Sequence, residues 1–115
     1  MRIVLIDDSD LLRKTVKRAC EEIKNVEIVG EAKDGLTALE VIKDKQPDLI
    51  ILDIRMPELN GISVLKKMKE EGTRCKICIL TNYPHQQYKE KCRAEGADYF
   101  FDKNKDFKLM LITIE

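Results

Sequence analysis

The chain has 115 residues, 43% of them hydrophobic, which is enough apolar material for one domain with a core of its own. Its 21 Lys and Arg residues balance 21 Asp and Glu residues, so the overall charge gives no reason to expect direct binding to nucleic acid or to a membrane surface. No apolar run approaches the roughly 18 residues of a transmembrane helix and no signal peptide opens the chain, so we expect a cytoplasmic protein.

Strand and helix patterns alternate along the chain. Five segments have the character of strands, the second one half-exposed: 3–6, 26–30, 49–52, 77–80 and 99–101. A helical pattern follows each strand, and the expected inward-facing residues are, in order, Leu12, Val16, Ala19 and Ile23; Leu36, Ala38, Leu39 and Ile42; Ile62, Leu65 and Met68; Tyr88, Cys92 and Ala94; and Phe107, Met110, Leu111 and Ile114. This alternation predicts one α/β domain over residues 1–115.

The last two helical segments are unusual in opposite ways. The fourth, from about Pro84 to Ala94, has few apolar residues, so we expect it to be the least firmly held helix. The fifth is apolar at six of the eight positions 107–114, and Leu109 and Ile112 would point away from the core. Three explanations remain open: a dimer surface, which we favour, a cut from a longer protein, or a partly extended segment.

Polar side chains stand where four of the apolar runs end. Asp7 and Asp8 follow the first strand, Asp53 follows the third, Thr81 follows the fourth, and Lys103 lies two residues beyond the fifth. Runs that are apolar on both faces are typical of parallel sheets covered by helices, and ligands of such sheets bind beyond the carboxyl ends of the strands. These residues therefore predict a site for a divalent cation and a phosphoryl group.

The four cysteines do not form a convincing metal or redox motif. Cys75 and Cys78 have two-residue spacing but lie at the entrance of a strand, where alternation sends them to opposite faces. A zinc site would need further ligands, and the single histidine, His85, does not supply a second pair. We interpret these two cysteines, with Cys20 and Cys92, as small hydrophobic residues in a reducing compartment.

The chain resembles the receiver domain of two-component response regulators over nearly all of its length. The residues that carry this resemblance are Asp7-Asp8, the segment 52–57 around Asp53 with Asn60-Gly61 behind it, Thr81, and Gly96-Ala97 followed by Lys103. The resemblance implies a flavodoxin-like (βα)5 three-layer sandwich with a five-stranded parallel sheet in the order 2-1-3-4-5.

The acidic residues are expected to hold a metal ion. Three carboxylates in one crevice repel one another, and a hard divalent cation with oxygen ligands resolves that conflict, Mg²⁺ being the usual cellular choice. The resemblance implies that Asp8 and Asp53 are direct ligands and that the backbone carbonyl of Arg55 is a third. Asp7 is expected to act through a water molecule.

The remaining site residues are expected to handle the phosphoryl group. The resemblance implies that Asp53 is the phosphoacceptor, with Lys103 contacting one phosphoryl oxygen as a point charge and Thr81 donating a hydrogen bond to another. It also implies a switch in which Thr81 moves toward the phosphoryl group and the aromatic side chain of Phe100 turns into the space vacated. Because Phe100 has no phenolic hydroxyl, we expect inward burial to be favoured.

Some positions depart from the family pattern or vary within the family. Lys103 is followed by Asn104 where many receivers have proline, so this bond is expected to be trans. Arg55 and Tyr83 are bulky residues beside the phosphoryl site, and we expect slow dephosphorylation because they hinder an attacking water. His85 is expected to be exposed at a helix start.

We therefore interpret the chain as a phosphorylation-activated switch and not as an enzyme with turnover. The resemblance implies a sensor histidine kinase or a histidine phosphotransfer protein as donor, and a protein target or output domain downstream. A homodimer through the fourth helix, fifth strand and fifth helix is a further expectation. The alternatives are a receiver excised from a DNA-binding transcription regulator, and an aspartate-nucleophile Mg²⁺ phosphatase. The phosphatase would need a second aspartate where Arg55 stands.

Overall fold

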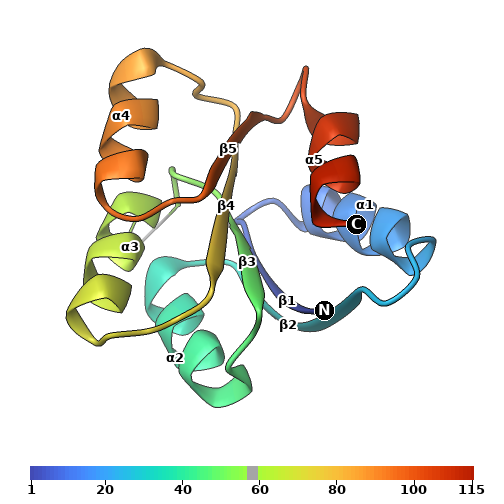
Figure 1. Ribbon diagram of the computed structural model, residues 1–115, viewed down its shortest axis with the longest axis horizontal. Helices are drawn as coiled ribbons and strands as arrows, with labels where there is room; N and C mark the ends of the chain where they lie inside the picture. The colour runs from blue at the N-terminus through green and yellow to red at the C-terminus, as the bar shows by residue number, and fades with distance from the viewer. Residues whose placement is uncertain (57–59) are drawn as a thin grey trace.

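A sheet of five parallel strands runs through the middle of the molecule (Figure 1). The computed structural model describes residues 1–56 and 60–115. Within these residues the strands are β1 (Arg2–Ile6), β2 (Glu27–Ala32), β3 (Leu49–Leu52), β4 (Lys76–Thr81) and β5 (Tyr99–Asp102). They lie in the order β2-β1-β3-β4-β5, which confirms the expected flavodoxin-like arrangement. Pro57 of the family motif lies outside the described residues.

Helices cover both faces of the sheet and make it the middle one of three layers. Helices α1 (Asp10–Glu21) and α5 (Phe107–Ile114) lie on one face, and α2 (Gly35–Lys45), α3 (Gly61–Glu70) and α4 (Gln86–Ala94) lie on the other (Figure 1). Alternate residues of the central strands feed the two cores: Val4, Ile6, Ile50 and Leu52 face α2 and α3, whereas Ile3, Leu5, Leu49 and Ile51 face α1 and α5. This two-sided burial explains the continuous apolar runs of the sequence.

Polar side chains cap the N-termini of three helices. The side chains of Ser9, Asp34 and Asn60 accept hydrogen bonds from backbone amides in the first turns of α1, α2 and α3. His85 occupies the same position before α4 but makes no such side-chain bond, and it is exposed as expected. Only Cys92 of α4 is fully buried. The fourth helix therefore starts without a side-chain cap, as α5 also does, and buries fewer residues than any other helix.

Two residues expected to face the core are instead exposed. Leu36 leaves 54% of its surface accessible, and Ala94 is also exposed. Each lies two positions from a buried residue of its own helix, Ala38 and Cys92 respectively. A step of two residues turns an α-helix through about 200°, so the members of such a pair point in opposite directions. In α1, Cys20 belongs to the buried face, which the expected set did not include.

The C-terminal segment is helical, so the partly extended alternative is wrong. Met110 and Ile114 are buried against the sheet, whereas Leu109 and Ile112 expose 53% and 66% of their surfaces, as expected. Within the described residues no peptide bond is cis, including the one between Lys103 and Asn104. In the part of the chain that the structure describes, no helix is both long enough and apolar enough to cross a bilayer.

All four cysteines are free thiols. Cys75 packs on the side of α2 and α3, and Cys78 belongs to the core beneath α1 and α5, so the expected separation to opposite faces is confirmed. Burial raises the pKa of Cys75 to about 11 and that of Cys78 to about 12. Such thiols are inert hydrophobic residues and not nucleophiles.

Candidate functional site

The sheet brings the expected site residues together at the carboxyl ends of its strands. Ile6 pairs with Leu52 in the register of β1 and β3, so Asp7 and Asp53 leave the sheet side by side. The Asp53 amide donates to the carbonyl of Ile6 at 3.0 Å. On the other side of β3, the Lys103 amide donates to the Thr81 carbonyl at 2.9 Å. These backbone hydrogen bonds thus fix the main-chain positions from which the side chains project.

Three carboxylates form the centre of the site. Asp7, Asp8 and Asp53 each offer one oxygen, and these oxygens lie within 4.8 Å of one another. Asp7 and Asp53 are almost completely buried, with 2% and 4% of their surfaces accessible, whereas Asp8 is exposed. The cluster is therefore closed from the core side and open to solvent at Asp8.

Lys103 supplies a positive charge to this cluster. Its Nζ lies 2.7 Å from Asp7 Oδ2 and 3.3 Å from Asp53 Oδ2, and only 9% of its side chain is accessible. A buried ammonium between two buried carboxylates offsets part of their repulsion and desolvation. The cluster of three acids and one base carries a formal charge of about −2 when all are ionised, so it still favours an additional cation.

Asp53 has an unusual electrostatic environment. Burial is the main influence and raises the pKa of its carboxyl, while the Lys103 ammonium acts in the opposite direction. The Asp7 carboxylate raises this pKa further, and a hydrogen bond from the Ile54 amide at 2.8 Å lowers it. The ionised form of Asp53 is therefore held at an energetic cost, which a bound cation would reduce.

Asp7 is anchored at every polar atom. Its amide donates to the Ala32 carbonyl at 3.0 Å, and its Oδ1 accepts from the Ser9 amide at 2.9 Å. Its Oδ2 meets Lys103, and its backbone carbonyl accepts from the guanidinium of Arg13. Both side-chain oxygens of Asp7 therefore already have partners within the protein.

Gly61 permits the backbone of α3 to approach the phosphoacceptor candidate closely. A Cβ at this position would lie 2.2 Å from the Asp53 carbonyl oxygen and 2.9 Å from the Ile54 Cα. The Gly61 amide also donates to the Ile54 carbonyl at 2.6 Å. Only glycine fits here, because any side chain would push against the main chain that carries Asp53.

Thr81 and two bulky residues lie toward the fourth and fifth strands. Thr81 is fully buried, and its Oγ1 accepts a hydrogen bond from the Tyr83 amide at 3.0 Å. The guanidinium of Arg55 lies 4.6 Å from the centroid of the Tyr83 ring, a cation–π contact. Arg55 and Tyr83 therefore form a contact between the segments that follow β3 and β4.

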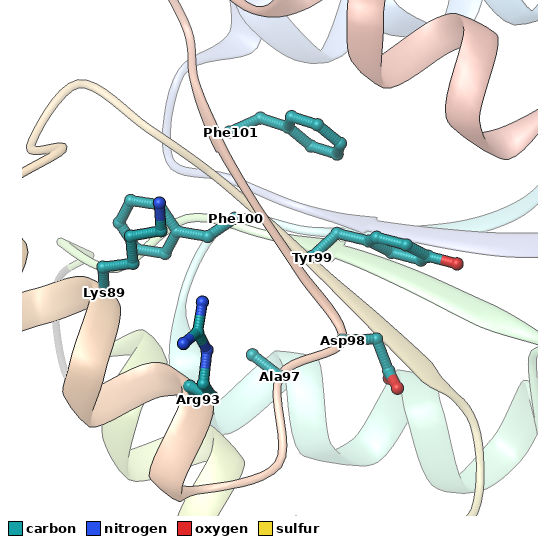
Figure 2. A pocket seen from close by; sticks show the side chains of 7 residues that line it. All are labelled: Lys89, Arg93, Ala97, Asp98, Tyr99, Phe100 and Phe101. Atoms are coloured by element: carbon teal, nitrogen blue, oxygen red, sulfur yellow. The ribbon is translucent and has the colours of Figure 1, made fainter.

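Phe100 is a residue of β5, and its side chain lies on the face of the sheet that α4 covers. It is half-buried against the α2–α4 side of the core, and a hollow of about 250 Å³ opens beside it. Figure 2 shows Phe100 directed toward Lys89 of α4, whereas Tyr99 and Phe101 point away from that helix. Of the two phenylalanines, only Phe101 is fully part of the core. Phe100 is thus placed where an aromatic side chain has room to turn.

Two supporting features were not recognised from sequence. Arg13 contacts the loop that carries the acidic pair, and nothing in its local pattern marks it as more than a helix-surface cation. Asp102 is buried at the end of β5, where its Oδ1 accepts from the Asn104 amide at 2.8 Å. The Asp102 amide in turn donates to Asp106 Oδ2 at 3.0 Å, which ties down the loop around Lys103.

The acidic cluster fits a magnesium ion. Its donors are hard carboxylate oxygens, which Mg²⁺ prefers over nitrogen or sulfur, and their spacing allows one cation to contact more than one of them. The exposure of Asp8 leaves room for the water ligands that Mg²⁺ retains. The residues present are therefore compatible with the cofactor that the sequence predicts.

Comparison with known proteins identifies the class. The model of the response regulator receiver domain family matches residues 3–115. The chain is 39% identical over 97 residues to the uncharacterized transcriptional regulatory protein YhcZ of Bacillus subtilis, which covers 84% of this chain and 45% of that protein. It is 33% identical over 102 residues to the nitrate/nitrite response regulator NarL of Escherichia coli, which covers 89% of this chain and 47% of that protein.

Solved structures agree with this result. The signal receiver domain of the response regulator NarL from Mycobacterium tuberculosis superposes with a TM-score of 0.91 at 30% identity, covering 98% of this chain and 91% of that one. The response regulator domain of CheB from Thermotoga maritima gives a TM-score of 0.89 at 27% identity, covering 99% and 90%. The chain therefore belongs to the response regulator receiver domain family, the phosphorylation-activated switches of two-component signalling. It spans about half the length, or less, of the curated relatives that it matches.

Proposed function

We propose that Asp53 is the phosphoacceptor of this receiver domain, that residues 1–115 form one such domain, and that its donor is a histidine kinase or a histidine phosphotransfer protein. The observation that supports this most strongly is the convergence of three carboxylates and one ammonium in a single cluster. Oxygens of Asp7, Asp8 and Asp53 lie within 4.8 Å of one another, and Lys103 Nζ reaches two of these carboxylates.

A magnesium site is part of this proposal. Asp8 and Asp53 would be direct ligands together with the backbone carbonyl of Arg55, and Asp7 would act through water. When bound, Mg²⁺ supplies charge neutralisation and alignment of the phosphoryl oxygens. The exposed position of Asp8 supports its role as a direct ligand.

The transfer itself uses the chain's own side chains. An oxygen of Asp53 attacks the phosphorus atom, a new O–P bond forms, and the P–N bond to the donor imidazole breaks, its electron pair returning to the nitrogen. Lys103 then shifts its ammonium from the two carboxylates to a phosphoryl oxygen. The Thr81 hydroxyl, which now accepts from the Tyr83 amide, turns to donate to another phosphoryl oxygen.

The domain is proposed to store the phosphoryl group and not to turn over a substrate. No side chain among the proposed site residues is placed as a general base for water. The Arg55–Tyr83 pair beside the site would restrict the approach of a hydrolytic water and lengthen the life of the acyl phosphate.

The proposed output is a change in the face formed by α4, β5 and α5. As Thr81 moves toward the phosphoryl group, Phe100 would turn inward from its half-buried position beside Lys89 (Figure 2). This face would then bind a protein target, an output domain or a second copy of the chain. The four free thiols support a reducing, cytoplasmic location.

A second candidate is the receiver portion of a DNA-binding transcription regulator. YhcZ is named as a transcriptional regulatory protein and NarL as a response regulator, and the matched region is less than half of each. The aspartate-nucleophile phosphatase is disfavoured because Arg55 occupies the position of its second aspartate.

Intact-mass measurement after incubation with acetyl phosphate and Mg²⁺ tests the proposal. Wild-type protein should gain the mass of one phosphoryl group, and a metal chelator should prevent the gain. Asp53→Asn should gain nothing. A gain of equal size in Asp53→Asn would contradict the assignment of Asp53, and a gain unaffected by chelation would contradict the metal site.

A further inference from the structure

Arg13 joins three parts of the structure at the back of the metal site. Its Nη1 donates to the backbone carbonyl of Asp7, and its Nη2 contacts the carboxylate of Asp10 at the start of α1. Its Nε donates to Glu31 Oε1 of β2 at 3.2 Å. Only 13% of the Arg13 side chain is accessible, so this is a packed contact and not a mobile surface pair.

Glu31 anchors this guanidinium to the edge strand. Its second oxygen, Oε2, accepts from Lys17 Nζ at 2.8 Å, so one carboxylate of β2 holds two cations of α1. The amide of Asp7 is bound to the neighbouring residue of β2, since it donates to the Ala32 carbonyl at 3.0 Å. Strand β2 therefore holds Asp7 in two ways. The Asp7 amide bonds directly to Ala32, and the Asp7 carbonyl is linked to Glu31 through the guanidinium of Arg13.

We propose that Arg13, held by Glu31, is a positioning residue that fixes the Asp7–Asp8 segment for metal binding. This inference rests on the proposed magnesium site. A guanidinium is suited to the task because it offers five donors in a rigid fork, whereas an ammonium is a single point charge and cannot span three acceptors in the same way. Residues that orient a metal-binding segment through hydrogen bonds commonly change metal affinity by about 10-fold to 100-fold when they are replaced.

The positioning role and a purely electrostatic role predict opposite results. Arg13 is a cation close to a cation-binding site, so as a charge alone it repels Mg²⁺. If charge were its whole contribution, Arg13→Gln would tighten magnesium binding and Arg13→Lys would leave it unchanged. If Arg13 positions the ligands, both substitutions weaken binding, because neither side chain spans the Asp7 carbonyl, Asp10 and Glu31 together.

Magnesium titration without any phosphoryl donor, followed by NMR, separates these cases. Arg13→Lys and Arg13→Gln should each raise the dissociation constant about tenfold. Glu31→Ala, which removes both anchoring oxygens, should weaken binding more than Glu31→Gln, which removes the same charge but keeps an oxygen that can accept from Arg13 Nε. This pair serves as the second test if an Arg13 substitution fails to fold. Lys17→Gln is the matched control, since Lys17 shares Glu31 but does not contact Asp7, and its affinity should equal that of the wild type.

A metal-free measurement tests the same role independently. The Ser9 amide donates to Asp7 Oδ1, so its hydrogen exchange reports on the order of the Asp7–Asp8 segment. It should exchange faster in Arg13→Lys than in the wild type, while core amides of β3 stay unchanged. Unchanged or tighter magnesium binding in folded Arg13 variants would overturn this inference but not the proposed metal site. Absence of magnesium binding by the wild-type protein would overturn the proposed metal site on which it depends.

Discussion

The acidic cluster and the α4–β5 face are built in opposite ways. In the cluster, every polar atom of Asp7 has a partner, the Asp53 and Lys103 side chains are almost fully buried, and Gly61 behind them leaves no room for a side chain. On the other face, α4 buries only one residue completely, starts without a side-chain cap, and leaves a hollow of about 250 Å³ beside Phe100 (Figure 2).

This difference suits the two tasks of a switch. Phosphoryl transfer needs charged groups held in fixed positions, and the backbone hydrogen bonds of the central strands provide them. Signalling needs an element with more than one accessible arrangement, and a helix with a small apolar face supplies it at low energetic cost. Thr81 and the β4–β5 pairing connect the two regions, because Thr81 pairs with Asp102 next to Lys103.

The largest effect should follow from adding a methyl group at Gly61, next to the main chain that carries Asp53. In Gly61→Ala the new Cβ would meet the Asp53 carbonyl oxygen at 2.2 Å, so the main chain must move. We expect a loss of about 3 kcal/mol of unfolding free energy and a large loss of phosphorylation by acetyl phosphate. Chemical denaturation and intact-mass kinetics measure the two effects.

Gly72→Ala is the matched control for this substitution. Gly72 has a φ of +69°, but a methyl group added there would meet no atom within 4 Å, so only backbone strain of about 1 kcal/mol is expected. Its phosphorylation rate should match that of the wild type. Equal rates for both alanine variants would show that the close contact at Gly61 is not needed to place Asp53.

Hydrogen exchange should distinguish α4, on the α4–β5 face, from the central strands. Amides of α4 should exchange through an opening that costs at least about 2 kcal/mol less than the opening of β4, because only Cys92 anchors this helix fully. Magnesium with beryllofluoride should slow exchange in α4 and change the side-chain environment of Phe100. Equal protection in α4 and β4, with no response to beryllofluoride, would remove the distinction between the two regions.

The smallest of these effects concerns the charge of Asp53. Burial raises the pKa of this carboxyl in the folded protein above its ordinary value. The protonated carboxyl therefore contributes fully to the unfolding free energy below the ordinary pKa, and this contribution is lost as the pH rises through the folded-state pKa. Without metal at pH 7, Asp53→Asn should therefore be more stable than the wild type by about 1 kcal/mol, or roughly 4 °C in Tm. Thermal unfolding in a chelator between pH 4 and 7 should show the difference shrinking toward acid.

Asp34→Asn provides the control of opposite sign. The hydrogen bond from the Thr37 amide lowers the pKa of Asp34, so this residue contributes stability above its ordinary pKa that is lost as the pH falls. Asp34→Asn should therefore give no gain in Tm at pH 7. A gain of similar size in both variants would show that general charge reduction, and not the burial of Asp53, is responsible.

The sheet and its acidic edge were predictable from sequence because each depends on local patterns. Runs such as 49–52 are apolar at every position, so the strand and the residue that follows it, Asp53, are evident without knowledge of the fold. The buried faces of the helices were harder to predict than the strands. Leu36 and Ala94 are apolar but lie about 200° around their helices from the buried residues Ala38 and Cys92, and composition alone does not reveal that orientation.

The role of Arg13 was not predictable for a different reason. Its three partners come from the β1–α1 loop, the start of α1 and the end of β2, and they meet only when β2 lies beside β1. In the sequence, Arg13 and Glu31 are two charges among many on exposed-looking positions. The same holds for Asp102, whose burial depends on how the loop after β5 folds back.

The central claim is that one particular carboxylate carries the phosphoryl group. Borohydride reduction of the phosphorylated protein converts an aspartyl phosphate to homoserine, which peptide mass spectrometry then locates. The account predicts homoserine at position 53 and at neither Asp7 nor Asp8, in a reaction that requires both Mg²⁺ and the phosphoryl donor. Homoserine at another position, or none in a protein that has gained the mass of a phosphoryl group, would contradict it.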